Sequence, residues 1–530
     1  MIVIPNLKLA PGADEAALKA LAAKALKIPA GDIAGLRIRK KSLDARRKDD
    51  IHYVYTVGVT MRGDEQRLVR RCRSAAIAHE KTYPIPHVAP PETRPVIVGF
   101  GPAGMFAALL LARAGTRPIV LERGPDARTR SAQIAAFRAG GAFDPECNVQ
   151  FGEGGAGTFS DGKLNTGTHD ARIGFVLAEF AAHGAPEHIT YDAKPHIGTD
   201  VLVEVVQSLR REVIDRGGEV RFGHRVTGLS TEDGRIAALT VRSPGGDYTL
   251  PAQQVILAIG HSARDTFEML HAQGVPMEPK PFSMGVRIEH RQSDINTAQY
   301  GAAAERLPAA DYSLSCHLPD GSSAYTFCMC PGGEVFAAAS EQGGVCTNGM
   351  SNSRRDGENA NAAVLVTLHP EDFPDKGTLG GMYWQRSIEQ RAFRCGGGNY
   401  HAPAQRVGDF LAGRASTAPG RVQPTYRPGV TWCDLHDVLP QRITATLAQA
   451  LPVFGQKLRG FDDPDAVLTA PETRSSSPVR IVRGPDRCST GVQGLYPCGE
   501  GAGYAGGITS AAVDGLRCAE CVIKALQNEA

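Results

Sequence analysis

Residues 94–105 read Arg-Pro-Val-Ile-Val-Gly-Phe-Gly-Pro-Ala-Gly-Met: a short apolar strand, a glycine-rich turn and the start of a helix. The helix is predicted over 105–115. A second strand, 118–121, ends in Glu122, about 20 positions after Gly99. This order is typical of the βαβ unit that binds a dinucleotide. The sequence therefore predicts an α/β fold built around this unit.

Each glycine of the turn has a separate mechanical task. Gly99 makes the tight turn, Gly101 lets backbone amides approach a pyrophosphate, and Gly104 lets the helix pack closely on the strand. The N-terminus of the helix adds partial positive charge beside the phosphates. Glu122 is expected to accept hydrogen bonds from a ribose diol.

The Gly-x-Gly-x-x-Gly pattern occurs twice more, without the rest of the unit. Residues 152–157 (GEGGAG) precede a turn-rich segment, and no strand ending in an acid follows at the required distance. Residues 501–506 (GAGYAG) stand between a predicted strand, 494–498, and a predicted helix, 508–526. We infer that one long dinucleotide contacts elements from both ends of the chain. FAD needs such further contacts, whereas NAD needs mainly the first unit.

Several motifs resemble the glutathione-reductase superfamily of flavoproteins. Residues 96–104 with Glu122-Arg123 resemble its first FAD motif, and 217–226 resemble the strand whose last residue contacts adenine. Residues 255–260 (VILAIG) resemble an internal strand, and 495–500 (LYPCGE) resemble the closing motif. That motif usually holds Asp, which binds the flavin ribityl chain, where this chain has Glu500. The helix that follows would direct its positive end at the flavin.

The FAD-binding residues expected from these patterns come from four parts of the chain. Gly154 and Gly155 join the set because the amides of 154–158 could form an anion nest over the pyrophosphate. The full set is Gly99, Gly101, Pro102, Ala103, Gly104, Glu122, Arg123, Gly154, Gly155, Val226, Gly260, Gly499, Glu500, Gly506, Gly507 and Ile508.

Longer stretches resemble a family of functionally uncharacterised FAD-dependent dehydrogenases. They are residues 152–164, 280–290, 326–335, 472–481 and 496–507, together with the basic segment 39–46. The resemblance covers nearly the whole chain and implies FAD, with no settled substrate. NAD(P)H, if it is used, would bind transiently, as in flavin hydroxylases, because no second complete dinucleotide unit is present.

Three bodies are predicted along the chain. Residues 1–90 form a small α+β domain, which a proline-rich linker at 83–95 ends. Residues 94–279 and 485–530 form a Rossmann-type, glutathione-reductase-like FAD-binding domain, and 280–484 form an inserted mixed-sheet substrate domain. Two further elements are expected: a helix over 64–80, carrying Arg67, Arg70, Arg71 and Arg73, and one strand over 219–229.

Composition excludes several classes of protein. Hydrophobic residues make up 42% of the 530 residues, which is ordinary for a globular protein. No apolar run approaches the ~18 residues of a membrane span, and the N-terminus lacks an export signal. We therefore expect a cytoplasmic protein whose 12 cysteines are reduced. No Cys/His cluster has the spacing of a metal site, so no metal is predicted.

Catalytic residues are not identified by any motif. Cys328 and Cys330 lie two residues apart in an extended stretch, which would put both thiols on one face. A thiol near the flavin could relay electrons, whereas the alternative role, usual for a buried cysteine, is packing as a small hydrophobic side chain. Lys163 is a candidate acid, base or flavin contact, as are His196, His261, Glu341 and Tyr504, because all stand beside glycine-rich turns. Arg474 with Ser475, Ser476 and Ser477 could bind an anionic substrate. Cys518 and Cys521 lie in mid-helix, where core packing is the expected role.

Two functions fit these observations. The first is an FAD-dependent oxidoreductase, a dehydrogenase or a reductase, acting on a small molecule in the 280–484 domain. The second comes from residues 1–90, which hold 17 Lys and Arg against 9 Asp and Glu. This basic domain could bind a nucleic acid and deliver the flavin to an RNA. Docking against the acidic remainder of the chain is the alternative role for the same charge.

Overall fold

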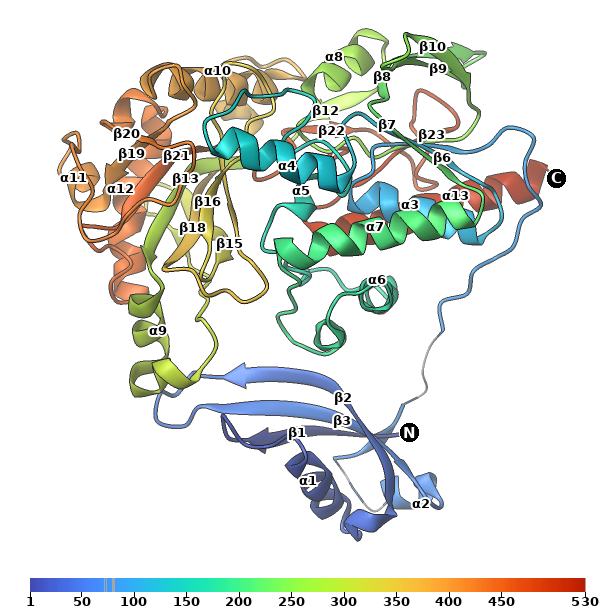
Figure 1. Cartoon of the computed structure of the whole chain (residues 1–530), viewed down its shortest axis with the longest axis vertical. Helices are drawn as coiled ribbons and strands as arrows, with labels where there is room; N and C mark the ends of the chain where they lie inside the picture. Colours follow the sequence, from blue (N-terminus) through green and yellow to red (C-terminus); the bar gives the residue numbers. More distant parts are fainter. Residues whose placement is uncertain (71, 73, 79–81, 530) are drawn as a thin grey trace.

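The N-terminal unit is a four-stranded antiparallel sheet with one helix on it (Figure 1). The computed structural model describes residues 1–70, 72, 74–78 and 82–529. The strands β1 (Ile2–Leu9), β2 (Ile33–Asp44), β3 (His52–Met61) and β4 (Ala76–Ile77) lie in the order β2-β3-β1-β4. Leu18 and Ala22 of α1 (Ala17–Leu26) pack on Ile4 and Val57.

The helix predicted over 64–80 is wrong in length. α2 (Glu65–Val69) begins where the Asp64 side chain accepts two backbone amides, and it spans five residues. Further on, Ala76 and Ile77 pair with β1 as strand β4, so sheet pairing replaces the second half of the predicted helix. Arg71, Arg73 and residues 79–80 lie outside the described part of the chain.

The second sheet is parallel and has the order β23-β11-β5-β6-β7. Its strands are β5 (Val96–Val98), β6 (Ile119–Glu122), β7 (Glu219–Phe222), β11 (Val255–Leu257) and β23 (Leu495–Pro497). Ile97 and Ile256 face a core shared with α3 (Pro102–Arg113), α6 (Arg172–Ala182), α7 (Thr199–Asp215) and α13 (Ile508–Glu529). The alternate residues, among them Val96 and Val98, face a core shared with an antiparallel meander.

That meander corrects a second prediction. The single strand expected over 219–229 is two strands in different sheets: β7 joins the parallel sheet, whereas β8 (Arg225–Glu232) pairs with β9 (Arg235–Arg242), which pairs with β10 (Tyr248–Pro251). Gly223 separates them with a φ of +72°, which an L side chain rarely adopts. The glycine therefore turns the chain from one sheet to the next.

The third sheet is mixed and has the order β14-β15-β18-β13-β21-β19-β20. Its strands are β13 (Phe282–Arg291), β14 (Ser315–His317), β15 (Ser323–Cys330), β18 (Asn359–Leu368), β19 (Ala402–Arg406), β20 (Val430–Trp432) and β21 (Val467–Glu472). Only the β19–β20 pair is parallel among these described strands. The α/β architecture with this additional mixed sheet agrees with the prediction.

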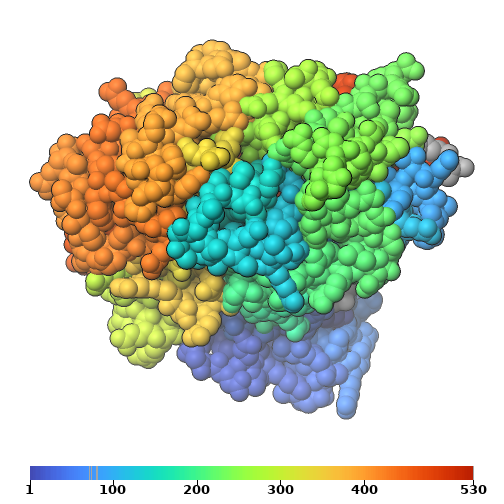
Figure 2. All heavy atoms as spheres, turned by 45° about the horizontal axis from the view of Figure 1, so that its top comes forward, coloured from blue at the N-terminus to red at the C-terminus, as the bar shows by residue number. Residues whose placement is uncertain are grey.

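A pair of short strands joins the part of the chain with the parallel sheet to the part with the mixed sheet. The chain passes from one part to the other at β12 (Met277–Pro279) and back at β22 (Val479–Ile481), and these two strands pair with each other. Figure 2 shows the segment around α4, coloured cyan, on the surface between the green and orange parts of the chain. The remaining elements are α4 (Ala127–Arg138), α5 (Gly155–Thr158), α8 (Arg264–Ala272), α9 (Gln292–Tyr300), α10 (Gly380–Cys395), α11 (Val407–Leu411), α12 (Gln441–Lys457), β16 (Glu334–Ala337) and β17 (Thr347–Met350).

Among the described residues, the helices are all too short or too polar to cross a lipid bilayer. All 12 cysteines fall within the described part of the chain, and each is a free thiol.

Candidate functional site

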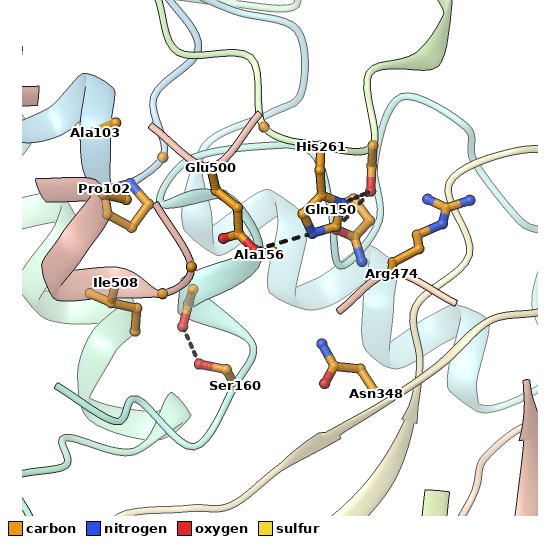
Figure 3. Close-up of a pocket in the computed structure, with 18 of the residues that line it drawn as sticks. Pro102, Ala103, Gln150, Ala156, Ser160, His261, Asn348, Arg474, Glu500 and Ile508 are labelled. Carbon is orange, nitrogen blue, oxygen red and sulfur yellow. Dashed lines mark hydrogen bonds and ion pairs between the residues drawn. The ribbon is translucent and has the colours of Figure 1, made fainter. Parts of the chain in front are cut away.

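A cavity of about 470 Å³ lies where the parallel sheet meets the mixed sheet. Its wall includes the turn at 99–103, the start of α13 and side chains of β15 and β17. Figure 3 shows Pro102 and Ile508 on one side of it and Asn348 and Arg474 on another. The turn at 99–103 and the start of α13, which are far apart in the sequence, thus meet the mixed sheet at one site.

The first glycine turn has the geometry that its sequence predicts. Gly99 has a φ of +96°, and a Cβ there would lie 2.4 Å from the carbonyl oxygen of Ala258. A Cβ on Gly104 would lie 2.0 Å from the carbonyl oxygen of Gly99. Gly101, by contrast, would place a Cβ no closer than 3.7 Å to Gly155, and it lines the cavity with Pro102 and Ala103. Gly104 therefore serves packing, while Gly101 leaves room for a ligand.

Glu122 closes this end of the cavity by holding backbone. Its carboxylate accepts the amides of Phe100 (2.8 Å), Gly124 (2.9 Å) and Gly152 (3.0 Å). Arg123 also lines the cavity, with its guanidinium 4.0 Å from the centre of the Phe151 ring. Val226 of β8 lines the same end. The carboxylate expected to meet a ribose thus also fixes two glycine-rich loops.

The second glycine-rich segment lies against the first. A Cβ on Gly155 would come within 3.0 Å of the Gly101 Cα, and Gly155 lines the cavity. Gly154 does not belong to the wall, which corrects its predicted role: its φ is +82°, and a Cβ there would collide with Thr158 Oγ1 at 1.8 Å. Gly154 therefore shapes the turn into α5 instead of facing the ligand.

Arg130 is a residue of this region that the sequence analysis missed. Its side chain is fully buried, and its guanidinium donates to the carbonyls of Asn148, Val149, Glu153 and Gly155 at 2.8–2.9 Å. Arg130 thereby holds the glycine-rich segment against the cavity. No local pattern distinguishes it from the other arginines of α4, because its partners are carbonyl groups distant in sequence.

The C-terminal end contributes Glu500, Gly506, Gly507 and Ile508 to the wall, and Gly260 lies beside them. Positions 260, 506 and 507 have no atom within 4 Å of an added Cβ, so the wall is open there. Gly499 stands behind the wall, where its amide donates to Asp514 Oδ2 at 2.8 Å. Burial raises the pKa of Glu500 to about 7, against the opposing effect of Lys280.

His261 faces Glu500 across the cavity, with Nε2 3.9 Å from Oε1 (Figure 3). Burial, together with the charges of Arg474 and Arg264, lowers the pKa of His261 to about 3. The ring is therefore neutral at ordinary pH. A neutral imidazole and a carboxyl that titrates near neutrality give this wall a proton donor and acceptor.

Cys328 and Lys163 lie on the mixed-sheet side of the cavity. Lys163 Nζ is 3.1 Å from Asp161 Oδ2 and donates a hydrogen bond to the carbonyl of Met329. Cys330 is fully buried and is not part of the wall. The simple two-residue alternation predicted for the thiols is wrong because a bulge interrupts β15 between Phe327 and Cys330.

The other candidates divide into two groups. Arg474 and Ser475 line the cavity, but the Arg474 guanidinium is paired with Glu389 (2.7 Å), and this carboxylate already neutralises its charge. Four candidates lie outside the wall, and each contacts another part of the protein. His196 contacts the Ser353 carbonyl, and Glu341 pairs with Arg386 and Arg264. Tyr504 donates to the Ile481 carbonyl, and Ser477 donates to the Val479 carbonyl. Ser476 is also absent from the wall, and Cys518 is buried in the helical core as predicted.

Within the described residues, two groups of side chains have the spacing of metal ligands: Cys498, Asp514 and Cys518, and Glu179, His183 and Glu212. In the first, Arg483 donates to both oxygens of Asp514, and in the second, Arg113 donates to both glutamates. Guanidinium groups thus already neutralise these carboxylates.

The wall fits FAD by three features of its own residues. The N-termini of α3 and α13 both border the cavity, and helix N-termini attract anions. Glycines leave the wall open at 101, 260, 506 and 507. Two acids, Glu122 and Glu500, stand at opposite ends, where hydroxyl groups of a nucleotide and of a ribityl chain need acceptors.

Comparisons with known proteins agree with this fit. The family model described as "FAD binding domain" matches residues 92–146, and the one described as "FAD-dependent protein, C-terminal domain-like" matches 281–475. Residues 1–60 match a domain of unknown function. An uncharacterized protein of Clostridium beijerinckii is 46% identical over 530 residues, covering 99% of this chain and 98% of that protein.

Solved structures are more distant. The flavin-dependent brominase Bmp2, as a triple mutant, has a TM-score of 0.39 and 11% identity, covering 82% of this chain and 80% of the brominase. A geranylgeranyl bacteriochlorophyll reductase-like protein of Thermoplasma acidophilum has a TM-score of 0.37 and 13% identity, covering 82% of this chain and 79% of that protein.

Proposed function

This chain belongs to the same family as the uncharacterized Clostridium beijerinckii protein, and we propose that it is an FAD-dependent oxidoreductase acting on a small molecule. The observation that carries the proposal is the single cavity shared by the 99–103 turn, the 506–508 helix start and the mixed sheet. The finer subtype, a glutathione-reductase-like nucleotide unit, belongs to the same proposal and rests on the motifs at 96–104 and 495–500.

Different residues would hold different parts of the cofactor. The α3 N-terminus with Gly101 and Gly155 would hold the pyrophosphate, Glu122 the ribose and the Val226 backbone the adenine. Glu500 would bind the ribityl chain, and the start of α13 would face the flavin. When bound, FAD supplies transfer of two electrons to or from the substrate.

The substrate would approach from the mixed-sheet side. Cys328, Asn348 and Ser475 line that wall, and His261 stands between it and Glu500. Because the ribityl chain would occupy Glu500, the neutral imidazole of His261, with one donor and one acceptor nitrogen, would exchange the substrate proton.

Purified protein provides the first test. We expect bound flavin, or uptake of added FAD, with the absorbance of a protein-bound flavin. Anaerobic addition of NADH or NADPH then asks whether a nicotinamide is the electron donor, and transient binding predicts bleaching of the flavin without a stable complex. Failure to bind FAD at all would refute the proposal.

The basic N-terminal domain has a second candidate function, nucleic-acid binding. Several of its cations already have partners within the domain: Lys41 with Glu15 (2.7 Å), Arg46 with Asp44 (2.6 Å) and Arg47 with Asp49 (2.8 Å). We therefore favour docking as its role. A salt-dependent gel shift of the whole protein with RNA at low salt would reverse this preference.

A further inference from the structure

Cys328 occupies a strained position at the end of β15. Phe327 pairs with Ala363 and Cys330 with Asn361, so β15 contains one more residue than β18 over the same stretch of paired strand, which is a β-bulge. Cys328 has a φ of +41°, a conformation that residues other than glycine rarely adopt. Strained positions of this kind collect at functional sites.

The two thiols of the bulge differ in access. Cys328 is partly accessible and lines the cavity, whereas Cys330 is fully buried behind it. The Cys330 thiol donates to the carbonyl oxygen of Cys328 at 3.2 Å. Residues two apart on an extended strand have Cα atoms about 6.6 Å apart, near the upper limit of about 6.8 Å for disulfides. The Cys330 side chain also contacts the Cys328 thiol, so the two sulfur atoms lie close enough for a disulfide to be considered.

Two cations stand beside the bulge. Lys163 donates to the carbonyl of Met329, between the two cysteines, and Arg287 donates to the carbonyl of Cys328 at 2.9 Å. Contact with the Cys330 thiol lowers the pKa of Cys328, and Lys163 and Arg287 lower it further against burial and Asp161. The same contact and burial raise the pKa of Cys330.

Neighbouring acids offset part of the positive charge of these two cations. Asp161 is paired with Lys163 and Arg355, and Glu472 is paired with Arg287 (2.6 Å). Asp311, which also lines the cavity, is paired with Lys194 (2.8 Å). Glu500 has a pKa raised to about 7 and loses its charge below that pH. The bulge therefore combines a thiol that the cavity can reach, with a lowered pKa, and a buried thiol with a raised pKa behind it.

We propose that Cys328 and Cys330 form a redox-active dithiol that exchanges two electrons with FAD in the same cavity. The inference rests on the proposed function, because FAD is the oxidant. The Cys328 thiolate and the Cys330 thiol form one S–S bond, and the electron pair and the Cys330 proton pass to oxidised FAD, giving its anionic two-electron-reduced form. In the reverse direction the reduced flavin breaks the S–S bond and restores thiolate and thiol.

The experiment is an anaerobic reductive titration of the FAD-bound, pre-oxidised protein with dithionite. We expect the wild type to consume twice as many electrons per flavin as Cys328→Ser or Cys330→Ser. The matched control is Cys518→Ser, since Cys518 interacts with Cys498 in a second thiol pair, away from the bulge. This control is expected to consume as many electrons as the wild type.

Thiol labelling gives a second measurement that needs no variant. The oxidised protein is denatured, alkylated and digested. Cys328 and Cys330 are expected to remain unlabelled in the one peptide that contains both, and to become labelled when the protein is reduced before alkylation. Electron uptake equal to the flavin alone, with both thiols labelled in oxidised protein, overturns the dithiol and leaves the FAD proposal standing. A protein that binds no FAD overturns both.

Discussion

Gly515 of α13 lies directly against Ala103 of α3: a Cβ at 515 would come within 2.1 Å of the Ala103 carbonyl oxygen. No side chain separates the two helices there. Both helices begin at the cavity wall, α3 at Pro102 and α13 at Ile508. The close crossing therefore fixes the distance between two helix N-termini that the cofactor would use together.

Gly515→Ala is expected to push these helices apart. Overpacking of this kind costs about 1–3 kcal/mol of unfolding free energy, and FAD affinity should fall because the two N-termini move. Urea denaturation and flavin content after purification measure the two effects. Lys524→Ala, at an exposed position of the same helix, is the control and should change neither. Unaltered flavin content in Gly515→Ala would contradict the role of the crossing.

Gly101→Val is expected to abolish FAD binding while the protein stays folded. An added Cβ at 101 meets no atom closer than 3.7 Å, so the valine methyl groups would enter the cavity instead of the core. Gly104→Ala is the contrasting variant, because its Cβ would strike the Gly99 carbonyl oxygen at 2.0 Å. It should lower the melting temperature. Retained flavin in Gly101→Val would show that the turn does not hold the cofactor.

Glu500→Gln is expected to change how stability depends on pH. In the folded protein the pKa of Glu500 is raised from 4.5 to about 7, so the folded state holds the proton more tightly than the unfolded chain. Stability is then greatest below pH 4.5 and falls as pH rises to 7. One pKa unit corresponds to about 1.4 kcal/mol, and cavity water reduces the effect because the side chain is 26% exposed.

Flavin-free wild type and Glu500→Gln, unfolded in urea at a series of pH values, test this effect. The variant should gain about 1–3 kcal/mol relative to the wild type between pH 4.5 and 8. A difference that stays constant with pH would mean that Glu500 titrates as an ordinary carboxyl.

Glu389→Gln is expected to be strongly destabilising. Glu389 accepts two hydrogen bonds from Arg264 and two from Arg474, and all three side chains are almost fully buried. Removing the shared anion leaves the buried Arg474 guanidinium without a carboxylate and Arg264 with Glu341 alone, a loss of about 3–5 kcal/mol. Glu268→Gln breaks a pair with Arg386 at a 38% exposed carboxylate, and it should cost less than about 1 kcal/mol. Chemical denaturation compares the two, and equal effects would contradict the argument.

The sequence predicted those parts of the site whose chemistry depends on backbone shape. Gly99 and Gly104 could be assigned because a turn and a close helix–strand contact each exclude a side chain, which leaves a local pattern. The meeting of 99–103 with 506–508 followed from one complete nucleotide unit, at 94–122, and an incomplete glycine motif at 501–506. Such features survive in sequence because they involve residues close together along the chain.

Long-range polar contacts could not be predicted in this way. Arg130 acts through carbonyls of 148–155, and nothing near it marks the role. The bulge that reorients Cys328 depends on pairing with β18, and β4 exists because Ile77 pairs with Ile2. In each case tertiary pairing overrides the local pattern.

Lys41→Pro is expected to release the N-terminal domain from the rest of the chain. The Lys41 amide points outward from its sheet and donates to the Tyr191 carbonyl (2.8 Å), while the Ala193 amide donates to the Lys41 carbonyl (2.8 Å). Proline removes that amide yet is tolerated at a sheet edge. Lys41→Ala keeps the amide and loses only side-chain contacts, the ion pair with Glu15 and the cation–π contacts with Tyr53 and Tyr55, so it is the matched control. Limited proteolysis within 83–95 should accelerate in the proline variant alone. Equal cleavage of both variants would mean that the side chain, and not the backbone pairing, holds the domain.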